Sequence, residues 1–181
     1  ILINEEVDGN FPNHHPDPGK EKTLVQLKEE IIRNDADIGF AFDGDGDRVG
    51  LVAKSGNQVL SDHIIMLLSQ YFWKLKKGPI VYDVKCSNEL PKLILEHGGK
   101  PVMEKTGHFN IKNRIKETSA ILGGEMSGHI FINHNWYGFD DAIYTAAIIT
   151  SILSNDKHTL DEMVSKFPKT YSTEELNLNV K

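Results

Sequence analysis

DGDGDR, at residues 43–48, follows directly on the apolar run Ile38–Phe42, whose length and residue types are those of a buried strand. A second apolar run, Val49–Ala53, comes after it, and the turn formers Ser55-Gly56-Asn57 separate that run from Gln58–Leu60. The stretch therefore predicts a strand, an acidic loop and a hairpin in succession.

Helices and strands alternate on both sides of this stretch. Leu24, Leu27 and Ile31 recur at helical spacing across residues 22–33, and Ser61 stands where it can cap a helix with a broad apolar stripe. The remaining pattern predicts strands at 1–3, 80–83, 101–103 and 120–122, and helices at 89–97, 109–117, 141–154 and after Thr159. This alternation indicates an α/β fold.

The change of pattern at Ser61 predicts two consecutive α/β domains, with mixed sheets flanked by helices. We expect the first to occupy residues 1–60 and to be incomplete, and the second to occupy residues 61–168. Residues 169–181 are then a connection toward a further domain that the chain does not contain.

The composition is that of a protein that buries a core. Of 181 residues, 39% are apolar and 25% are charged, and the net charge of -6 leaves no basic stripe to bind nucleic-acid phosphates. No apolar run approaches the ~20 residues that span a bilayer. Cys86 is the only cysteine, which rules out an internal disulfide, and the N-terminus shows no export signal. We therefore expect no nucleic-acid or membrane partner and a cytoplasmic location.

The acidic loop predicts a metal site. Asp43, Asp45 and Asp47 stand at alternate positions, and their carboxylates would repel one another if they converged without a cation. Gly44 and Gly46 allow the tight backbone that convergence requires. Hard oxygen ligands suit Mg²⁺, so we expect a magnesium site; an acidic surface turn is the competing interpretation.

Two other chemistries use similar residues. An EF-hand needs Gly at its sixth position and Glu at its twelfth, where this chain has Arg48 and Lys54, so calcium sensing is excluded. A haloacid-dehalogenase-like phosphatase would use Asp43 as nucleophile and Asp45 as acid, and that alternative stays open. It does not explain Asp47 and Arg48, since a fixed cation beside a metal suits a phosphoryl group in transfer.

A second loop, GGEMSGH at residues 123–129, offers polar groups to a polyol. Glu125 can accept hydrogen bonds and Ser127 can both donate and accept, so the pair can hold neighbouring hydroxyls of a sugar. A structural turn with a capping serine explains the loop about equally well.

A third group lies where ligands gather in open α/β sheets, beyond the carboxyl ends of strands. Lys105–His108 precedes a predicted helix, and Lys85 ends another strand. His108 can move protons near neutral pH, and Lys85 can act as a cation, an acid or a base. For each residue alone, an ordinary surface position is the competing interpretation.

Taken together, four stretches resemble the α-D-phosphohexomutase family, in its phosphomannomutase/phosphoglucomutase branch. They are Val7–Pro18 (VDGNFPNHHPDP), Phe42–Arg48, Lys105–His108, and Gly124–His129 followed by Tyr137–Asp141. Their order and spacing agree with the family over essentially the whole chain. The family has four domains around a deep cleft, and the resemblance implies that this chain holds the later part of the second domain and most or all of the third.

The resemblance also implies which parts lie outside this chain. The first domain would carry the serine that exchanges a phosphoryl group with the sugar, and the fourth would bind the phosphate that is not being transferred. A chain without these two domains would be inactive alone. Within this chain, Asp43, Asp45 and Asp47 would bind Mg²⁺, and Arg48 would lie near the transferring phosphate.

The remaining site residues would bind and position a hexose phosphate. By resemblance, Glu125 and Ser127 would hold its 3- and 4-hydroxyls. His108, Lys85 and His129 would line the reaction centre, with the first two as candidates for proton transfer. The implied reaction is an isomerisation that moves phosphate between the 6- and 1-positions through a bisphosphorylated sugar.

Two details bear on the branch of the family. Met126 favours the mannose and glucose enzymes, because the glucosamine branch is expected to have Gln there. Ser87-Asn88 departs from the Thr-Arg of many relatives, so a cationic contact is lost or supplied elsewhere. Besides the mutase fragment and the phosphatase, a non-catalytic module that binds sugar phosphates stays open as a third function.

Overall fold

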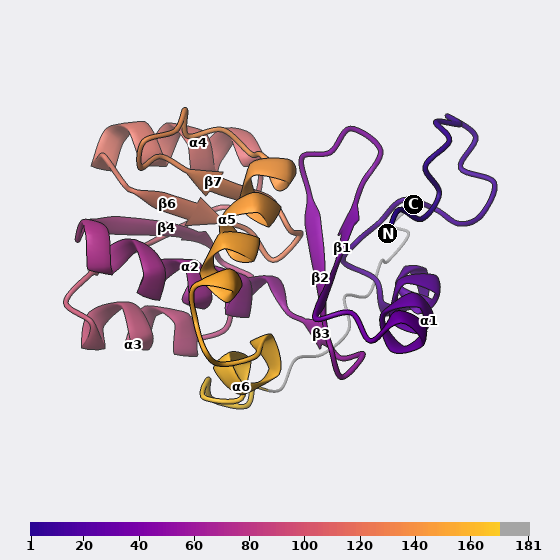
Figure 1. Ribbon diagram of the computed structural model, residues 1–181. Coiled ribbons are helices and arrows are strands. Elements are labelled where there is room, and N and C mark those ends of the chain that lie inside the picture. The colour runs from indigo at the N-terminus through magenta and orange to yellow at the C-terminus, as the bar shows by residue number, and fades with distance from the viewer. Residues whose placement is uncertain (171–181) are drawn as a thin grey trace.

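The structure, a computed structural model, describes residues 1–170 of the chain and contains two sheets with helices against them (Figure 1). The smaller unit holds α1 (Val25–Asn34), preceded by a 3₁₀ turn, and three strands. The larger unit holds four strands and the other five helices of the described residues. This is the α/β class expected from the alternation of strands and helices.

The smaller sheet has the order β1-β2-β3 and is antiparallel throughout. β1 (Ile38–Phe42) pairs with β2 (Val49–Ala53), and Phe42 lies opposite Val49. β2 then pairs with β3 (Gln58–Val59). The acidic loop is therefore the connection of a β-hairpin, which holds both its ends on paired strands.

The larger sheet has the order β5-β4-β6-β7 and is mixed. Its strands are β4 (Pro79–Asp83), β5 (Lys100–Glu104), β6 (Leu122–Gly124) and β7 (Ile130–Ile132). β4 is parallel to both β5 and β6, whereas β7 runs antiparallel to β6. Because β4, β5 and β6 are parallel, their carboxyl ends lie at the same edge of the sheet.

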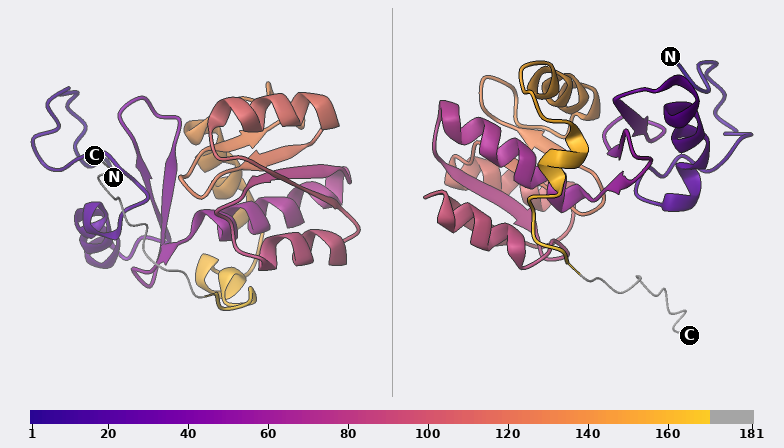
Figure 2. Two further views of the ribbon diagram at one scale, coloured as in Figure 1. Left: turned by 180° about the vertical axis from the view of Figure 1, so that it is seen from behind. Right: turned by 60° about the horizontal axis from the view of Figure 1, so that its bottom comes forward.

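The larger unit, which Figure 2 shows from two further sides, has five helices up to residue 170. They are α2 (Ser61–Leu75), α3 (Glu89–Glu96), α4 (His108–Thr118), α5 (Ala142–Ser154) and α6 (Leu160–Val164). α2 and α3 contact each other, α6 packs against α2, α4 packs on β4 and β6, and α5 contacts both β2 and β7. The largest core cluster runs from Val49 and Leu51 of the smaller unit into Ile64 and Ile65 of α2, so the two units share apolar packing.

Three local expectations were wrong. Ser61 does not cap α2, because the helix begins at Ser61 itself and its capping position is Leu60, which has no side-chain hydrogen-bond group. Ile1 and Leu2 are exposed, and residues 1–3 pair with no strand in the described part of the chain. The strand expected at 120–122 is β6 at Leu122–Gly124.

Gly123 and Gly124 lie in strand β6 and not in a loop, and their lack of a side chain allows close packing. A Cβ atom on Gly123 would lie 2.7 Å from Ile115 Cδ1 of α4, and one on Gly124 would lie 2.5 Å from Ile65 Cδ1 of α2. Helices thus approach this strand closely on both faces. The expected connection at 169–181 lies outside the described residues from position 171 onward.

Gly124→Ala is expected to lower the free energy of unfolding by about 1–3 kcal/mol, because the added methyl group overpacks a buried contact with Ile65. Denaturant unfolding followed by tryptophan fluorescence measures the change. Gly9→Ala is the matched control, since no atom of residues 1–170 lies within 4 Å of its added Cβ. Equal stability of the two variants would contradict the packing role.

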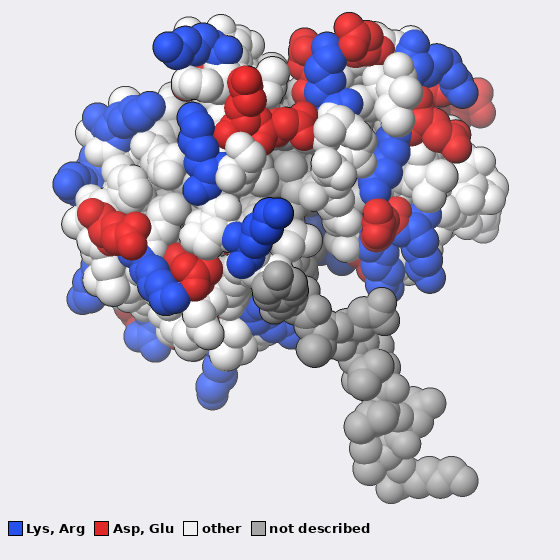
Figure 3. All heavy atoms as spheres, turned by 90° about the horizontal axis from the view of Figure 1, so that it is seen from below, with Lys and Arg blue, Asp and Glu red and all other residues white. Residues whose placement is uncertain are grey.

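In the described part of the chain, no helix has both the length and the apolar character needed to cross a membrane. On the face shown in Figure 3, lysines and arginines are interspersed with aspartates and glutamates. That face therefore presents no extended field of one sign.

Candidate functional site

The acidic loop brings its three carboxylates together. Asp43, Asp45 and Asp47 each offer an oxygen, and these oxygens all lie within 4.8 Å of one another. Gly46 adopts a positive φ of 74°, a conformation that glycine takes without steric cost. The loop thus places three hard oxygen donors around one point.

Asp43 organises the loop as well as facing its centre. Its Oδ1 accepts hydrogen bonds from the backbone N–H groups of Asp47 and Arg48, both at 3.1 Å, and its Oδ2 accepts one from Arg48 Nε at 2.7 Å. Partial burial raises the pKa of Asp43, but the hydrogen bonds and the charge of Arg48 outweigh it and lower the pKa below its ordinary value. A carboxylate so engaged on both oxygens is a poor nucleophile, which weighs against the phosphatase alternative.

Of the three acids, Asp47 is the one whose negative charge the surroundings disfavour. Partial burial and the carboxylates of Asp43 and Asp45 raise the pKa of Asp47, and His129 opposes the rise. Like charges held this close favour a neutral form unless a cation compensates them. The site therefore has the electrostatic character of one that binds a cation.

Arg48 connects the acidic loop to the proline-rich segment Val7–Pro18. Its Nη1 lies 3.4 Å from Asp17 Oδ1, while its Nε bonds Asp43. The Asp17 contact was not foreseen, because no residue of Val7–Pro18 was assigned a role from the sequence. Arg48 is about three-quarters buried and fixed between two acids, so its guanidinium is held rigidly beside the three carboxylates.

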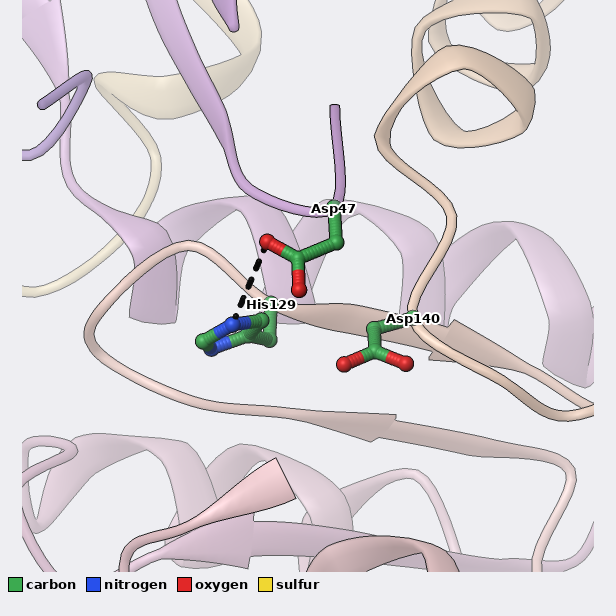
Figure 4. A group of neighbouring side chains, drawn as sticks. All are labelled: Asp47, His129 and Asp140. Carbon is green, nitrogen blue, oxygen red and sulfur yellow. Dashed lines mark ion pairs between the residues drawn. The ribbon is translucent and has the colours of Figure 1, made fainter. Parts of the chain in front are cut away.

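The two predicted loops meet through their backbones. Val49 N donates to Gly128 O at 3.0 Å, and Arg48 and His129 form an isolated antiparallel bridge. A Cβ on Gly128 would lie 2.9 Å from Val49 O, so this approach requires glycine. The contact places His129 Nε2 3.4 Å from Asp47 Oδ1. Figure 4 marks this ion pair with a dashed line.

Glu125 is more enclosed than a free sugar ligand would be. It is 1% exposed; its Oε1 accepts a hydrogen bond from Gly107 N, and its Oε2 lies 2.9 Å from His129 Nδ1. Ser127 is half-buried, with its Oγ 2.8 Å from the same nitrogen. In this arrangement Ser127 is the more accessible of the two, and Glu125 holds the histidine.

His129 lies among three acids. Burial lowers its pKa, but the hydrogen bond to Glu125 and the charges of Asp47, Glu125 and Asp140 outweigh burial and raise the pKa above its ordinary value. The site therefore favours a positive charge at the His129 ring.

His108 begins α4 and is exposed, with its ring stacked on His129 at a centroid distance of 6.0 Å. Its Nδ1 lies 2.8 Å from Lys112 Nζ and 3.5 Å from Asp140 Oδ2. Neither Lys112 nor Asp140 was assigned a role from the sequence. The available signals were the i, i+4 spacing of His108 and Lys112, and the pair of acids directly before α5.

Asp83 joins the three turns at the carboxyl edge of the larger sheet. It is fully buried and accepts hydrogen bonds from Cys86 Sγ at 3.1 Å, Thr106 Oγ1 at 3.0 Å and Met126 N at 3.2 Å. Burial, with the neighbouring charge of Asp83, raises the pKa of the buried Cys86 thiol, so the thiol stays protonated and is a poor nucleophile. Lys85 is exposed in the first of these turns.

Comparisons with known proteins find one family for both units. The family profile described as "Phosphoglucomutase/phosphomannomutase, alpha/beta/alpha domain III" matches residues 60–171, and the profile for domain II of the same family matches residues 1–56.

Individual relatives give the same result. A phosphomannomutase/phosphoglucomutase of Pseudomonas syringae pv. tomato is 51% identical over 181 residues, covering 99% of this chain and 39% of the relative. A phosphoglucomutase of Neisseria gonorrhoeae is 46% identical, covering 97% of this chain and 38% of the relative. A solved structure of a phosphoglucomutase/phosphomannomutase family protein from Burkholderia thailandensis, 44% identical, superposes with a TM-score of 0.88 over 93% of this chain and 37% of that one. The chain thus spans well under half the length of these relatives.

Proposed function

Because this chain belongs to the phosphoglucomutase/phosphomannomutase family, we propose that it is the metal- and sugar-binding part of a longer mutase, an isomerase that interconverts hexose 6-phosphates and hexose 1-phosphates. The observation that carries the proposal is the junction of the two loops, with Val49 N bonded to Gly128 O at 3.0 Å. This junction puts the acidic loop and the Glu125–His129 loop at one centre. The transferred phosphoryl group would reside on a serine outside this chain, so the chain alone would be inactive.

Asp43, Asp45 and Asp47 are the proposed ligands of Mg²⁺. Their oxygens lie within 4.8 Å of one another and are of the hard type that this ion prefers. The bound ion would neutralise charge on a phosphoryl group as it transfers. Arg48, fixed beside these acids, would orient the phosphate through its N–H groups.

The other site residues would bind the sugar and move protons. Ser127 and Glu125 would bind the hydroxyls that lie between the two reactive ends, so that the sugar can be held in either orientation. Glu125 would reach a substrate only if the contacts to Gly107 and His129 rearrange, because both its oxygens face protein groups. His108 and Lys85, both exposed, would donate and accept the proton of the reacting hydroxyl, with His129 beside them.

The proposed substrates are phosphates of mannose and glucose. The proposed partners within the parent protein are a preceding domain with the phosphorylated serine and a following domain that binds the second phosphate. In that arrangement, residues 1–60 are the later part of the second domain, 61–168 are the third, and 169–181 connect it to the fourth. A cytoplasmic location is proposed because Cys86 is buried as a free thiol, which suits a reducing compartment.

A coupled assay on the longer protein tests this function. We expect conversion of glucose 1-phosphate and mannose 1-phosphate into the 6-phosphates, dependent on Mg²⁺ and on a sugar bisphosphate primer. Release of inorganic phosphate without isomerisation would instead support a phosphatase. Saturable binding of sugar phosphates with neither reaction would support a binding module.

Ser127→Ala is expected to raise KM for the hexose phosphate by about 2- to 10-fold in the longer protein, because one hydrogen bond of ordinary strength is lost. Initial rates over a range of substrate concentrations measure this change. Ser154→Ala is the matched control, since among the described residues the Ser154 hydroxyl bonds only Thr150 O, within α5. An unchanged KM in Ser127→Ala would remove this residue from the sugar site.

A further inference from the structure

Asp47, His129 and Asp140 form a second group of potential metal ligands. Each offers one ligand atom, and the three atoms lie within 4.8 Å of one another. Figure 4 shows the two carboxylates and the imidazole ring turned toward a common space. They come from the β-hairpin loop, from the residue before β7 and from the segment before α5. Only Asp47 is shared with the proposed magnesium ligands.

The distances suit a small cation of tetrahedral preference. For a zinc ion with ligands at 2.0–2.1 Å, neighbouring ligand atoms lie about 3.4 Å apart. His129 Nε2 is 3.4 Å from Asp47 Oδ1. These two atoms can therefore bind one ion with little movement.

The other nitrogen of His129 has the partner that a metal-binding histidine requires. Nδ1 lies 2.9 Å from Oε2 of Glu125, which is 1% exposed. An ionised carboxylate only accepts hydrogen bonds, so Glu125 keeps a proton on Nδ1, and a cation that displaces the proton of Nε2 would bind there beside Asp47. Buried carboxylates that hold a ring N–H in this way orient metal-binding histidines and strengthen their binding.

A buried oxygen of Asp140 is an independent observation that favours a metal site. Its side chain is 7% exposed, and its Oδ2 is buried with no hydrogen bond from the residues that the structure describes. Lys112 Nζ is 3.0 Å from Oδ1, and His108 Nδ1 is 3.5 Å from Oδ2. A buried carboxylate oxygen left without a donor is costly, and a bound cation would satisfy it.

The charges around this group also favour a divalent cation. Asp47, Glu125 and Asp140 place three negative charges around the His129 ring, against the positive charges of Lys112 on Asp140 and of Arg48 near Asp47. One imidazole nitrogen with two carboxylate oxygens is a donor set of zinc-type cations, whereas Mg²⁺ prefers oxygen alone.

We propose that Asp47, His129 and Asp140 form a second metal site, which binds zinc or a cation of similar ligand preference and leaves a fourth position open. The site overlaps the proposed reaction centre, since Asp47 and His129 belong to both, but zinc binding needs only residues of this chain and can be measured without the mutase reaction. Because Asp47 belongs to both groups, magnesium lowers the apparent zinc affinity, and the two cations compete for that carboxylate.

Calorimetric titration of the chain with zinc chloride tests the site. We expect one saturable site that His129→Gln and Asp140→Asn each weaken by at least about 10-fold, the lower end of the effect of removing an outer partner of a metal ligand. Asp45→Asn removes a ligand from the magnesium group alone and acts on the zinc group only through the charge near Asp47, so it is expected to weaken zinc binding less than either of these variants. Titration with magnesium gives the opposite pattern, with weaker binding in Asp45→Asn and unchanged binding in Asp140→Asn.

A spectroscopic measurement on the unaltered chain tests the zinc site even if the variants fail to fold. Zinc is expected to shift the ¹⁵N resonance of Nε2 of His129 while Nδ1 keeps its proton. His158→Gln is the matched control, since His158 also pairs with a carboxylate, Asp156, at 2.7 Å, but on an exposed surface. The proposal is overturned if zinc affinity is the same in His129→Gln and the parent chain, or if binding follows the exposed pair His14-His15 instead.

Discussion

Asp45→Ala is expected to lower kcat of the longer mutase by about 100-fold or more, since a bound metal contributes several kcal/mol to the stabilisation of charge in the transition state. Of the three acids, Asp45 gives the most direct test of metal binding by substitution. It is exposed, and within the described residues its side chain makes no hydrogen bond or ion pair. Asp43, by contrast, also holds the loop through Asp47 N, Arg48 N and Arg48 Nε.

The measurement is kcat at saturating hexose phosphate over a series of magnesium concentrations. High magnesium is expected to restore part of the activity, because two of the three ligands remain. The melting temperature is expected to stay unchanged. Asp37→Ala is the matched control, an aspartate whose side chain is 87% exposed at the far end of β1. Full turnover by Asp45→Ala at low magnesium would remove the metal assignment, whereas the zinc titration of the chain would be unaffected by that outcome.

Asp83→Ala is expected to lower the free energy of unfolding by about 2–4 kcal/mol, because it leaves one buried and two partly buried hydrogen bonds without their acceptor and opens a cavity. The donors are Thr106 Oγ1 and Met126 N, in two turns far apart in the sequence, together with the thiol of Cys86. Asp83→Asn keeps one acceptor oxygen and the side-chain shape, so its effect is expected to be smaller.

Denaturant unfolding followed by tryptophan fluorescence measures this loss, since Trp73 and Trp136 both lie in the unit that contains Asp83. Hydrogen exchange at Met126 N gives a local measure, and it is expected to be faster in both variants. Asp37→Ala is again the control, with an expected change within about 0.5 kcal/mol. Stability of Asp83→Ala within that same range would show that the three turns are held by other contacts.

The family and the fold class followed from the sequence, and the comparisons and the structure confirm both. Helix periodicity predicted α3, α4 and α5 to within about two residues, because an amphipathic stripe is a local pattern. The glycines of β6 were misassigned to a loop. Their reason for being glycine is the approach of Ile65 and Ile115 from two helices, which no local pattern reveals.

The convergence of Asp43, Asp45 and Asp47 was likewise predictable, since both ends of their loop lie on one hairpin and the intervening glycines allow a tight turn. The roles of these residues, and of Arg48, Lys85, His108, Glu125, Ser127 and His129, stay predictions.

The sequence by itself determined most of the helices, the strands on either side of the acidic loop, the loop itself and the resemblance, because each depends on residues that are neighbours along the chain. Only the tertiary structure decided that Glu125 is enclosed against His129, that Asp17 reaches Arg48, and that Asp140 lies beside both histidines. These contacts join segments that pack together only after both sheets have formed. Their geometry is set by the shared core and by the junction of Val49 with Gly128, and not by any property of the segments taken singly.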